Sequence, residues 1–153
     1  MVATPFPLDL PEVTLRPAKL TDAAAFANLA TQLGYPSSPQ QVAERLASVL
    51  DDQKHLILAA VSGDRVVGWA HAYVCCLVES DTFAELGGLV VDESYRGKGI
   101  GGKLLDKVEN WAHQKGCAAV SVRSNIIRLQ AHKFYTARGY DQIKTQHSFR
   151  KLL

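Results

Sequence analysis

A glycine-rich turn near the middle of the chain joins a β-branched strand to a long amphipathic helix. The sequence there runs Val90-Val91-Asp92-Glu93-Ser94-Tyr95-Arg96-Gly97-Lys98-Gly99-Ile100-Gly101-Gly102. Glycine lets the backbone approach an anion closely, and the N-terminus of the following helix adds unpaired N–H donors and the positive end of its dipole. The segment therefore predicts a binding site for a pyrophosphate group, and we call residues 96–102 the cradle.

Two other phosphate-binding motifs share this layout, but each requires a side chain that this sequence lacks. A Walker A loop requires Ser or Thr after its Gly-Lys pair to hold magnesium, but the pair at 102–103 is followed by Leu104. A dinucleotide-binding fingerprint fits the spacing of the cradle glycines and also needs an acidic residue about 20 positions later. Residues 120–125 read VSVRSN and contain no carboxylate. Both sites are therefore disfavoured.

The remaining pattern is an arginine, Arg96, followed by Gly-x-Gly-x-Gly. It resembles the Arg/Gln-x-x-Gly-x-Gly/Ala signature of the GNAT superfamily of acyl-CoA-dependent N-acyltransferases. Residues 125–140, NIIRLQAHKFYTARGY, are similar to the Asn…Ala-x-x-Phe-Tyr-x-x-x-Gly-Tyr/Phe block that follows the fifth strand in that superfamily. The two blocks occur in the same order as in the family, and the resemblance covers roughly residues 13–153.

Hydrophobic periodicity and turn residues predict one domain, residues 13–153, after an extended N-terminal arm of residues 1–12. Strands are expected over Val13–Arg16, His55–Val61, Arg65–Val78, Phe83–Val91 and Ala118–Val122, with one or two closing strands between Tyr140 and Lys151. Helices are expected from Thr21 or Asp22 to Leu33, from a capping box of Ser38 and Gln41 to Leu50, along the apolar stripe from Ile100 to Ala112, and from Leu129 to Arg138. Together with the resemblance, these elements predict an α/β (α+β) fold of the GNAT type, with a mixed, mostly antiparallel central sheet and helices on both faces.

The composition is that of an ordinary globular enzyme domain. A chain of 153 residues that is 47% hydrophobic can bury one core, and a net charge of +2 is too small to indicate nucleic acid. Neither a leader nor a membrane-length apolar run is present, so we expect no membrane partner and a cytoplasmic location. The three cysteines are expected to be reduced and buried. The histidines lack metal-ligand spacing, and no metal is expected.

The resemblance implies transfer of an acetyl group from acetyl-CoA to an amine. The amine must first lose a proton, since an ammonium with a pKa near 10.4 has no lone pair; at pH 7 this costs roughly 4 to 5 kcal/mol, at about 1.36 per pKa unit. Glu85 stands 11 residues before Arg96, where the superfamily's protein-acetylating members keep a glutamate general base. The resemblance therefore implies that Glu85 is the base, although a water chain or a merely solvent-facing edge residue is also compatible.

Tyr135 falls on the tyrosine of the family's Phe-Tyr pair. In many members this phenol points at the CoA sulfur and acts as the general acid that neutralises the leaving thiolate. A tyrosine after a phenylalanine on an amphipathic helix is also often a core residue. The resemblance thus implies an acid role for Tyr135, with packing as the alternative.

The remaining predicted site residues bind the cofactor. The resemblance implies that strand residues offer backbone groups to pantetheine, that Asn125 bonds the pantetheine arm or caps a helix, and that nearby cations hold the phosphates. Gly87 and Gly88 suggest a bulge or a close backbone approach in the same strand. The predicted acetyl-CoA-binding residues are Leu89, Val90, Val91, Arg96, Gly97, Lys98, Gly99, Ile100, Gly101, Gly102, Asn125, Arg128 and His132.

The acceptor is predicted to be a small cationic amine. Glu79, Asp81 and Glu85 cluster in the sequence where the chain leads toward the thioester, whereas cations gather around the cradle. Two alternatives stay open: a protein or peptide N-acetyltransferase, and a non-catalytic acyl-CoA-binding module. A homodimer, common in the family, is compatible with the resemblance.

Overall fold

A computed structural model describes residues 12–153, so nearly all of the predicted N-terminal arm lies outside the described residues. The chain divides into two compact units, one that ends at Val122 and one from Arg123 to Leu153. Each unit is described by itself.

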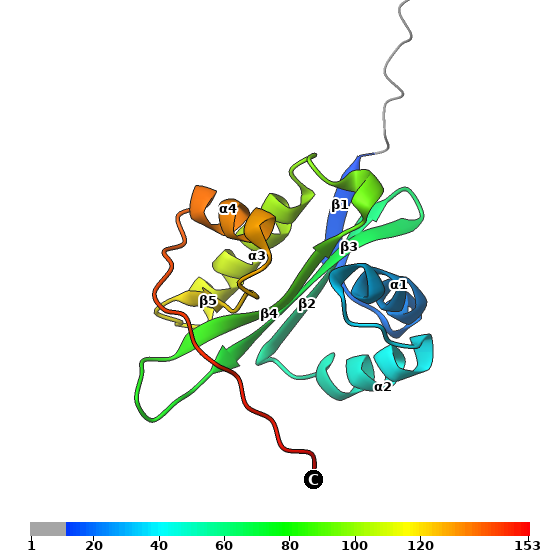
Figure 1. The fold of residues 1–153 in the computed structure, drawn as a ribbon. Coiled ribbons are helices and arrows are strands. Elements are labelled where there is room, and N and C mark those ends of the chain that lie inside the picture. The colour runs from blue at the N-terminus through cyan, green and yellow to red at the C-terminus, as the bar shows by residue number, and fades with distance from the viewer. Residues whose placement is uncertain (1–11) are drawn as a thin grey trace, which may run out of the picture. The chain divides into compact units, whose positions relative to one another are not determined.

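The first unit contains a five-stranded sheet among its described residues, in the order β1-β2-β3-β4-β5 (Figure 1). The strands are β1 (Val13–Pro17), β2 (His55–Ser62), β3 (Arg65–Cys75), β4 (Phe83–Val91) and β5 (Val120–Val122). Neighbours from β1 to β4 pair antiparallel, and β5 pairs parallel with β4. This confirms the predicted mixed, mostly antiparallel sheet.

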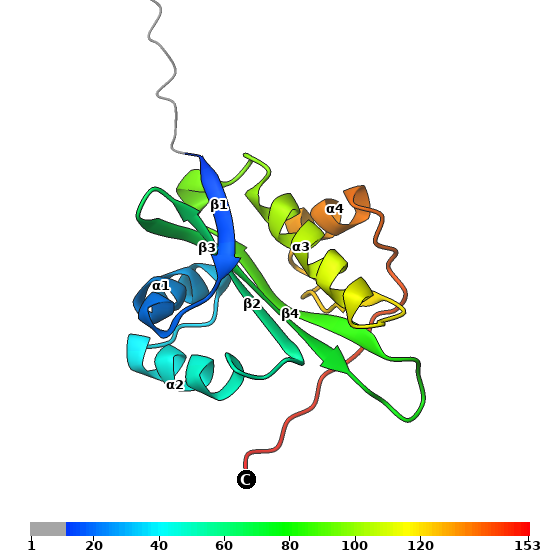
Figure 2. The same ribbon diagram turned by 180° about the vertical axis from the view of Figure 1, so that it is seen from behind.

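Helices cover both faces of this sheet. Figures 1 and 2 show α1 (Ala23–Leu33) and α2 (Pro39–Val49) on one side and α3 (Ile100–Gln114) on the other. The start of α2 follows the predicted capping box: Gln41 N donates to Ser38 Oγ at 3.1 Å, and Ser38 N donates to Gln41 Oε1 at 2.9 Å. The start of α2 is therefore set by local side-chain chemistry.

The two faces of the sheet have separate hydrophobic cores. Alternate residues of β2, such as Ile57 and Ala59, pack with Phe26 of α1 and Leu46 of α2. On the other face lies α3, whose Leu104, Leu105 and Val108 are fully buried, as the apolar stripe predicts. Burial of this stripe fixes α3 and thus the cradle at its N-terminus.

Strand β4 carries the predicted bulge. His71 pairs with Gly88 and Ala72 with Leu86, which leaves Gly87 as the extra residue. A Cβ on Gly88 would lie 2.6 Å from Cζ3 of Trp69, so this position also shows the predicted close approach. The Trp69 ring in turn stacks on Phe26 with ring centroids 5.6 Å apart.

The second unit holds α4 (Leu129–Ala137) and a C-terminal segment without regular structure. The predicted closing strands between Tyr140 and Lys151 are therefore wrong. Ile143 and Phe149 are 80% and 91% exposed, and the residues between them are polar. Without an alternating apolar face, little burial stabilises a strand there.

Two further predictions need correction. Strand β3 ends at Cys75, before the predicted Val78, because Leu77 and Val78 find nothing to pack against and stay exposed. The cysteines are not buried: Cys76 is exposed, and Cys75 and Cys117 are half-buried. No helix of residues 12–153 has the length and apolar character that a membrane crossing requires.

Candidate active site

The cradle lies between β4 and α3. Gly97 and Gly99 have φ angles of 75° and 80°, in the left-handed region that favours glycine, and a Cβ on either would meet no atom within 4 Å. No side chain caps α3, and its first hydrogen bond runs from Lys103 N to Gly99 O at 3.1 Å. The N–H groups of residues 100–102 therefore have no acceptor within the helix, as in the helix N-termini that bind anions.

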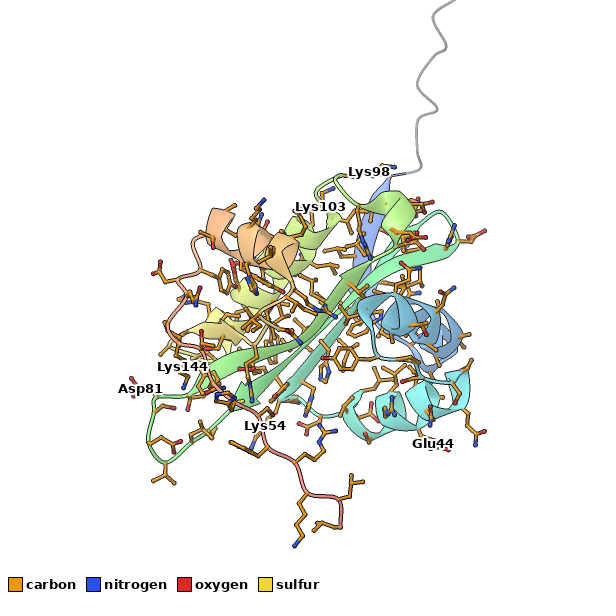
Figure 3. All side chains as sticks on the ribbon, in the orientation of Figure 1. Glu44, Lys54, Asp81, Lys98, Lys103 and Lys144 are labelled. Carbon is orange, nitrogen blue, oxygen red and sulfur yellow. The ribbon has the colours of Figure 1, made fainter. Side chains whose placement is uncertain are left out.

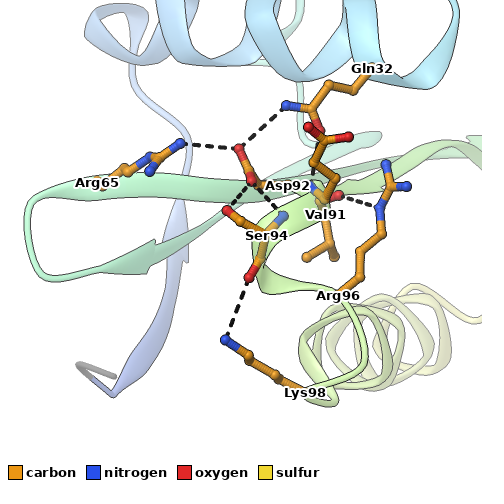
Figure 4. A network of polar contacts seen from close by, with 8 residues as sticks. Gln32, Arg65, Val91, Asp92, Ser94, Arg96 and Lys98 are labelled. Carbon is orange, nitrogen blue, oxygen red and sulfur yellow. Dashed lines mark hydrogen bonds and ion pairs between the residues drawn. The ribbon is translucent and has the colours of Figure 1, made fainter. Parts of the chain in front are cut away.

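A buried aspartate holds the turn that leads into the cradle (Figure 4). Asp92 Oδ1 accepts from Ser94 N at 2.9 Å and from Ser94 Oγ at 2.5 Å, and Asp92 Oδ2 accepts from Gln32 Nε2 at 3.3 Å and Arg65 Nη2 at 3.2 Å. Bonds from Ser94, then from Gln32 and the Arg65 charge, lower the pKa of Asp92 against the opposing effect of burial. The turn is thus fixed to α1 and to the β2–β3 hairpin. Sequence analysis missed this role, although Asp-x-Ser is a signal for such a turn.

Two exposed cations, Arg96 and Lys98, lie among the cradle glycines. Arg96 Nε donates to Val91 O at 3.0 Å, and Lys98 Nζ donates to Ser94 O at 3.5 Å. Lys98 also lies 5.2 Å from the centre of the Tyr95 ring. Figure 3 shows Lys98 and Lys103 at the same end of the first unit. The structure therefore brings the predicted Arg96 and Lys98 together with the cradle glycines.

The edge of β4 that precedes the cradle is open on one side. Leu89, Val90 and Val91 pair with β3, but β5 pairs with β4 only at residues 84–86. Beyond Leu86, β4 has no strand partner on the β5 side among the described residues. An unpaired edge presents N–H and C=O groups to an extended chain or ligand.

Glu85 lies on β4 and is only 5% exposed. It pairs across the sheet with Tyr73 of β3 and with Ser121 of β5. The alternative of a solvent-facing edge residue is thus ruled out, because β5 pairs with this part of β4. The carboxylate lies on the same strand as the open edge, toward its other end.

Two histidines that sequence analysis set aside meet on β2 and β3, and Tyr73, the cross-strand partner of Glu85, is also the cross-strand partner of His55. His55 Nδ1 and His71 Nε2 are 2.9 Å apart across β2 and β3, although the residues are 16 positions apart in the sequence. Tyr73 stacks on His55 with centroids 5.7 Å apart. Burial, and then the nearby His55, lower the pKa of His71 to about 4. Only the pairing of the strands reveals this cluster, so spacing along the chain could not have found it.

The other predicted site residues belong to the second unit. Asn125 Oδ1 accepts from Ile127 N at 3.1 Å, and His132 Nε2 lies 2.9 Å from Asn125 O. Arg128, not Asn125, is the residue that precedes α4, so Asn125 is not its cap. Tyr135 packs edge-on against Phe134, and burial raises the pKa of Tyr135 to about 12 against an opposing effect of Arg128.

Known proteins share both the sequence and the fold. The Acetyltransferase (GNAT) family profile matches residues 23–140. An aminoglycoside N(6′)-acetyltransferase type 1 from Stenotrophomonas maltophilia is 31% identical over 142 residues, which span 90% of this chain and 92% of the relative. An aminoalkylphosphonate N-acetyltransferase from Salmonella typhimurium is 36% identical over 63% of this chain and 62% of its own length.

A solved structure of AAC(6′)-Iy with the bisubstrate analogue CoA-S-monomethyl-acetylneamine superposes with a TM-score of 0.81 at 19% identity. The alignment covers 93% of this chain and 99% of that one, and it shows that the fold is shared. With the family profile spanning most of the described residues and the cradle in place, the chain belongs to the GNAT family and is an acetyl-CoA-dependent N-acetyltransferase.

Proposed function

We propose that the protein acetylates a primary amine of a small cationic molecule by direct attack of the amine within a ternary complex. The observation that carries this proposal is the arrangement along β4. A buried carboxylate, Glu85, and an open backbone edge, residues 89–91, lie on one strand that leads into the cradle. An acceptor held near Glu85 would therefore meet a thioester held along the same strand.

The residues present fit acetyl-CoA. The cradle N–H groups, with Arg96 and Lys98, would hold the diphosphate, and the edge of residues 89–91 would hold the pantetheine arm. On the family resemblance, Asn125, Arg128 and His132 are also proposed to bind acetyl-CoA. Bound acetyl-CoA supplies an acetyl group activated as a thioester.

Glu85 is the proposed general base. Its carboxylate would take the proton that the acceptor ammonium must lose before its nitrogen can attack. Burial at 5% exposure supports this role, because a carboxylate shielded from water interacts more strongly with a nearby cation.

Tyr135 is the proposed general acid. With its pKa raised to about 12, the phenol keeps its proton on Oη throughout the neutral range. A protonated hydroxyl can donate to the departing sulfur, whereas a phenolate could not. Tyr135→Phe should slow turnover by roughly 10 to 10⁴-fold with little change in CoA affinity. Tyr35→Phe, at a residue that is 68% exposed, is the control and should change neither.

The acceptor class rests on charge and on the relatives. Glu79 and Asp81 are exposed in the loop between β3 and β4, and Figure 3 shows Asp81 away from Lys98 and Lys103. Carboxylates there would attract a cationic amine. The aminoglycoside acetyltransferase relative supports a polycationic acceptor, whereas the aminoalkylphosphonate relative supports an amine that carries an anionic group.

An acceptor panel tests the proposal. Thiol release from acetyl-CoA would be measured with an aminoglycoside, a polyamine, an aminoalkylphosphonate and a lysine peptide. We expect the highest kcat/KM with the aminoglycoside or the polyamine. Preference for the aminoalkylphosphonate or the peptide would overturn the acceptor class, and no release with any amine would favour a non-catalytic acyl-CoA-binding module.

A further inference from the structure

Four polar side chains form a row across three neighbouring strands, and we call His55, His71, Tyr73 and Glu85 the polar row. His55 pairs directly with Tyr73, and Tyr73 pairs directly with Glu85. Cross-strand partners point to the same face of a sheet, and His71 shares that face because it lies two positions from Tyr73. The row therefore runs from the buried Glu85, near the start of β4, to His55, the first residue of β2.

The outer end of the row reaches the surface. The His55 side chain is 23% exposed, and its Nε2 lies 4.0 Å from Oδ2 of Asp52, which is 49% exposed. Glu85, at the inner end, is 5% exposed. Among the described residues of the first unit, Asp52 and Lys54 precede His55 at the outer end of the row, and Tyr73 on β3 pairs with both His55 and Glu85.

A buried base creates a problem that this row can solve. In each cycle Glu85 would gain one proton from the acceptor and must lose it before the next cycle. Direct loss to water is hindered because the carboxyl is buried. A proton acceptor within the protein, connected to solvent, would remove this obstacle.

We propose that His55 and His71 relay the proton from Glu85 to solvent beside Asp52. The inference rests on the proposed role of Glu85 as the general base. It assigns a function to His55 and His71, which are neither the proposed base nor the proposed acid. Both histidines are positioning residues in this sense, since they act through Glu85 and not on the acceptor.

The relay balances in protons. The 2.9 Å contact requires one ring to donate and the other to accept, so His71 Nε2–H can donate to the lone pair of His55 Nδ1. A proton that arrives from Glu85 through a bridging water binds His71 Nδ1. His71 then passes its Nε2 proton to His55, and His55 releases its Nε2 proton to Asp52 or water. Exchange of ring protons with solvent restores the starting tautomers.

The low pKa of His71 allows this residue to pass the proton on without retaining it. With a pKa of about 4, His71 is neutral near pH 7 and holds an extra proton only briefly. The carboxylate of Asp52, whose Oδ2 lies 4.0 Å from His55 Nε2, places a negative charge at the outer end of the row.

The test is rescue by buffer. His55→Gln should lower kcat by about 10-fold or more in dilute buffer, and added imidazole should restore most of it, because imidazole can accept the proton in place of the relay. The KM of the amine should stay within about 2-fold. His71→Gln should behave alike, and if it fails to fold, the more exposed His55 variant decides. His113→Gln, at an exposed histidine of α3, is the matched control and should show neither loss nor imidazole response.

Two results would overturn the relay: wild-type kcat in His55→Gln, or a lowered kcat that imidazole does not restore. Either result with an impaired Glu85→Gln variant rejects the relay but leaves the proposed base in place. An unimpaired Glu85→Gln variant, or a wild-type protein that releases no thiol with any amine, would instead reject the proposed function.

Discussion

The cradle and the polar row differ in how the chain builds them. The cradle consists of consecutive residues, and its donors are backbone N–H groups that a helix start and glycines expose. The polar row consists of side chains from β2, β3 and β4, which meet only after the strands pair. The first can be found by reading along the sequence, while the second depends on register. It follows that single side-chain changes should disturb the row strongly, whereas the cradle should respond mainly to changes at its glycines.

The largest expected effect is on the row. Glu85→Gln removes the proposed base and should lower kcat/KM by roughly 10² to 10⁴-fold near neutral pH. The loss should shrink as the pH rises, because more of the amine is then free without help. A pH profile of kcat/KM for both proteins measures this, and profiles of the same shape and height would place the base elsewhere.

The second effect is on stability and concerns the inner histidine. Burial lowers the pKa of His71 from 6.5 to about 4, so the unfolded chain binds a proton between these values and the folded chain does not. The contribution of neutral, buried His71 to the free energy of unfolding is therefore fully present above pH 6.5. It is lost as the pH drops toward 4, by up to about 3 kcal/mol at about 1.36 per pKa unit. Urea unfolding at pH 7 and pH 4.5 should show this fall, and it should be smaller in His71→Gln. An equal fall in both proteins would contradict the assignment.

The third effect tests the backbone nature of the cradle with two matched glycines. Gly99 and Gly116 have φ angles of 80° and 75°, and a Cβ on either meets no atom within 4 Å. Either change to alanine should cost about 1 to 2 kcal/mol of stability, since alanine resists the left-handed region. Only Gly99→Ala should also weaken acetyl-CoA binding, by about 10 to 100-fold in calorimetry. Equal weakening by Gly116→Ala would mean that strain alone accounts for the loss.

Specificity for the cofactor belongs to the same comparison. Acetyl-CoA should raise the melting temperature of the wild-type protein by mass action, and ATP or NAD at equal concentration should raise it far less. Equal stabilisation by all three ligands would reduce the cradle to a general anion site.

The smallest expected effect is long-range attraction of the acceptor. Glu79→Lys with Asp81→Lys should raise the KM of a polycationic amine by about 2 to 5-fold and that of a singly charged amine less. The difference should fade with added salt, because both residues are exposed. Glu44→Lys, on exposed α2 surface, should change neither KM. A KM unaffected by charge reversal would leave the β3–β4 loop without a role in attraction.

The sequence predicted the features whose cause is local. Ser38 and Gln41 mark the start of α2, the apolar stripe of α3 is buried, and the glycine pair at 87–88 marks the bulge. The closing strands failed because strand formation needs a buried face, and Ile143 remains exposed. The histidine pair was missed because its members come from separate strands, and their proximity depends on a register that no local pattern encodes.

The contact between Trp69 and Gly88 makes Trp69 an intrinsic fluorescent probe of β4. The chain has two tryptophans, and the other, Trp111, lies on α3. In a Trp111→Phe protein, ultraviolet emission would come from Trp69 alone, whose ring lies against the bulge of β4 and whose Nε1 donates to Phe26 O at 3.3 Å. Any shift of β4 on filling of its open edge changes the surroundings of that indole. Binding of a ligand at the edge could thus be followed in real time, without a label, as a shift in the emission maximum of Trp69.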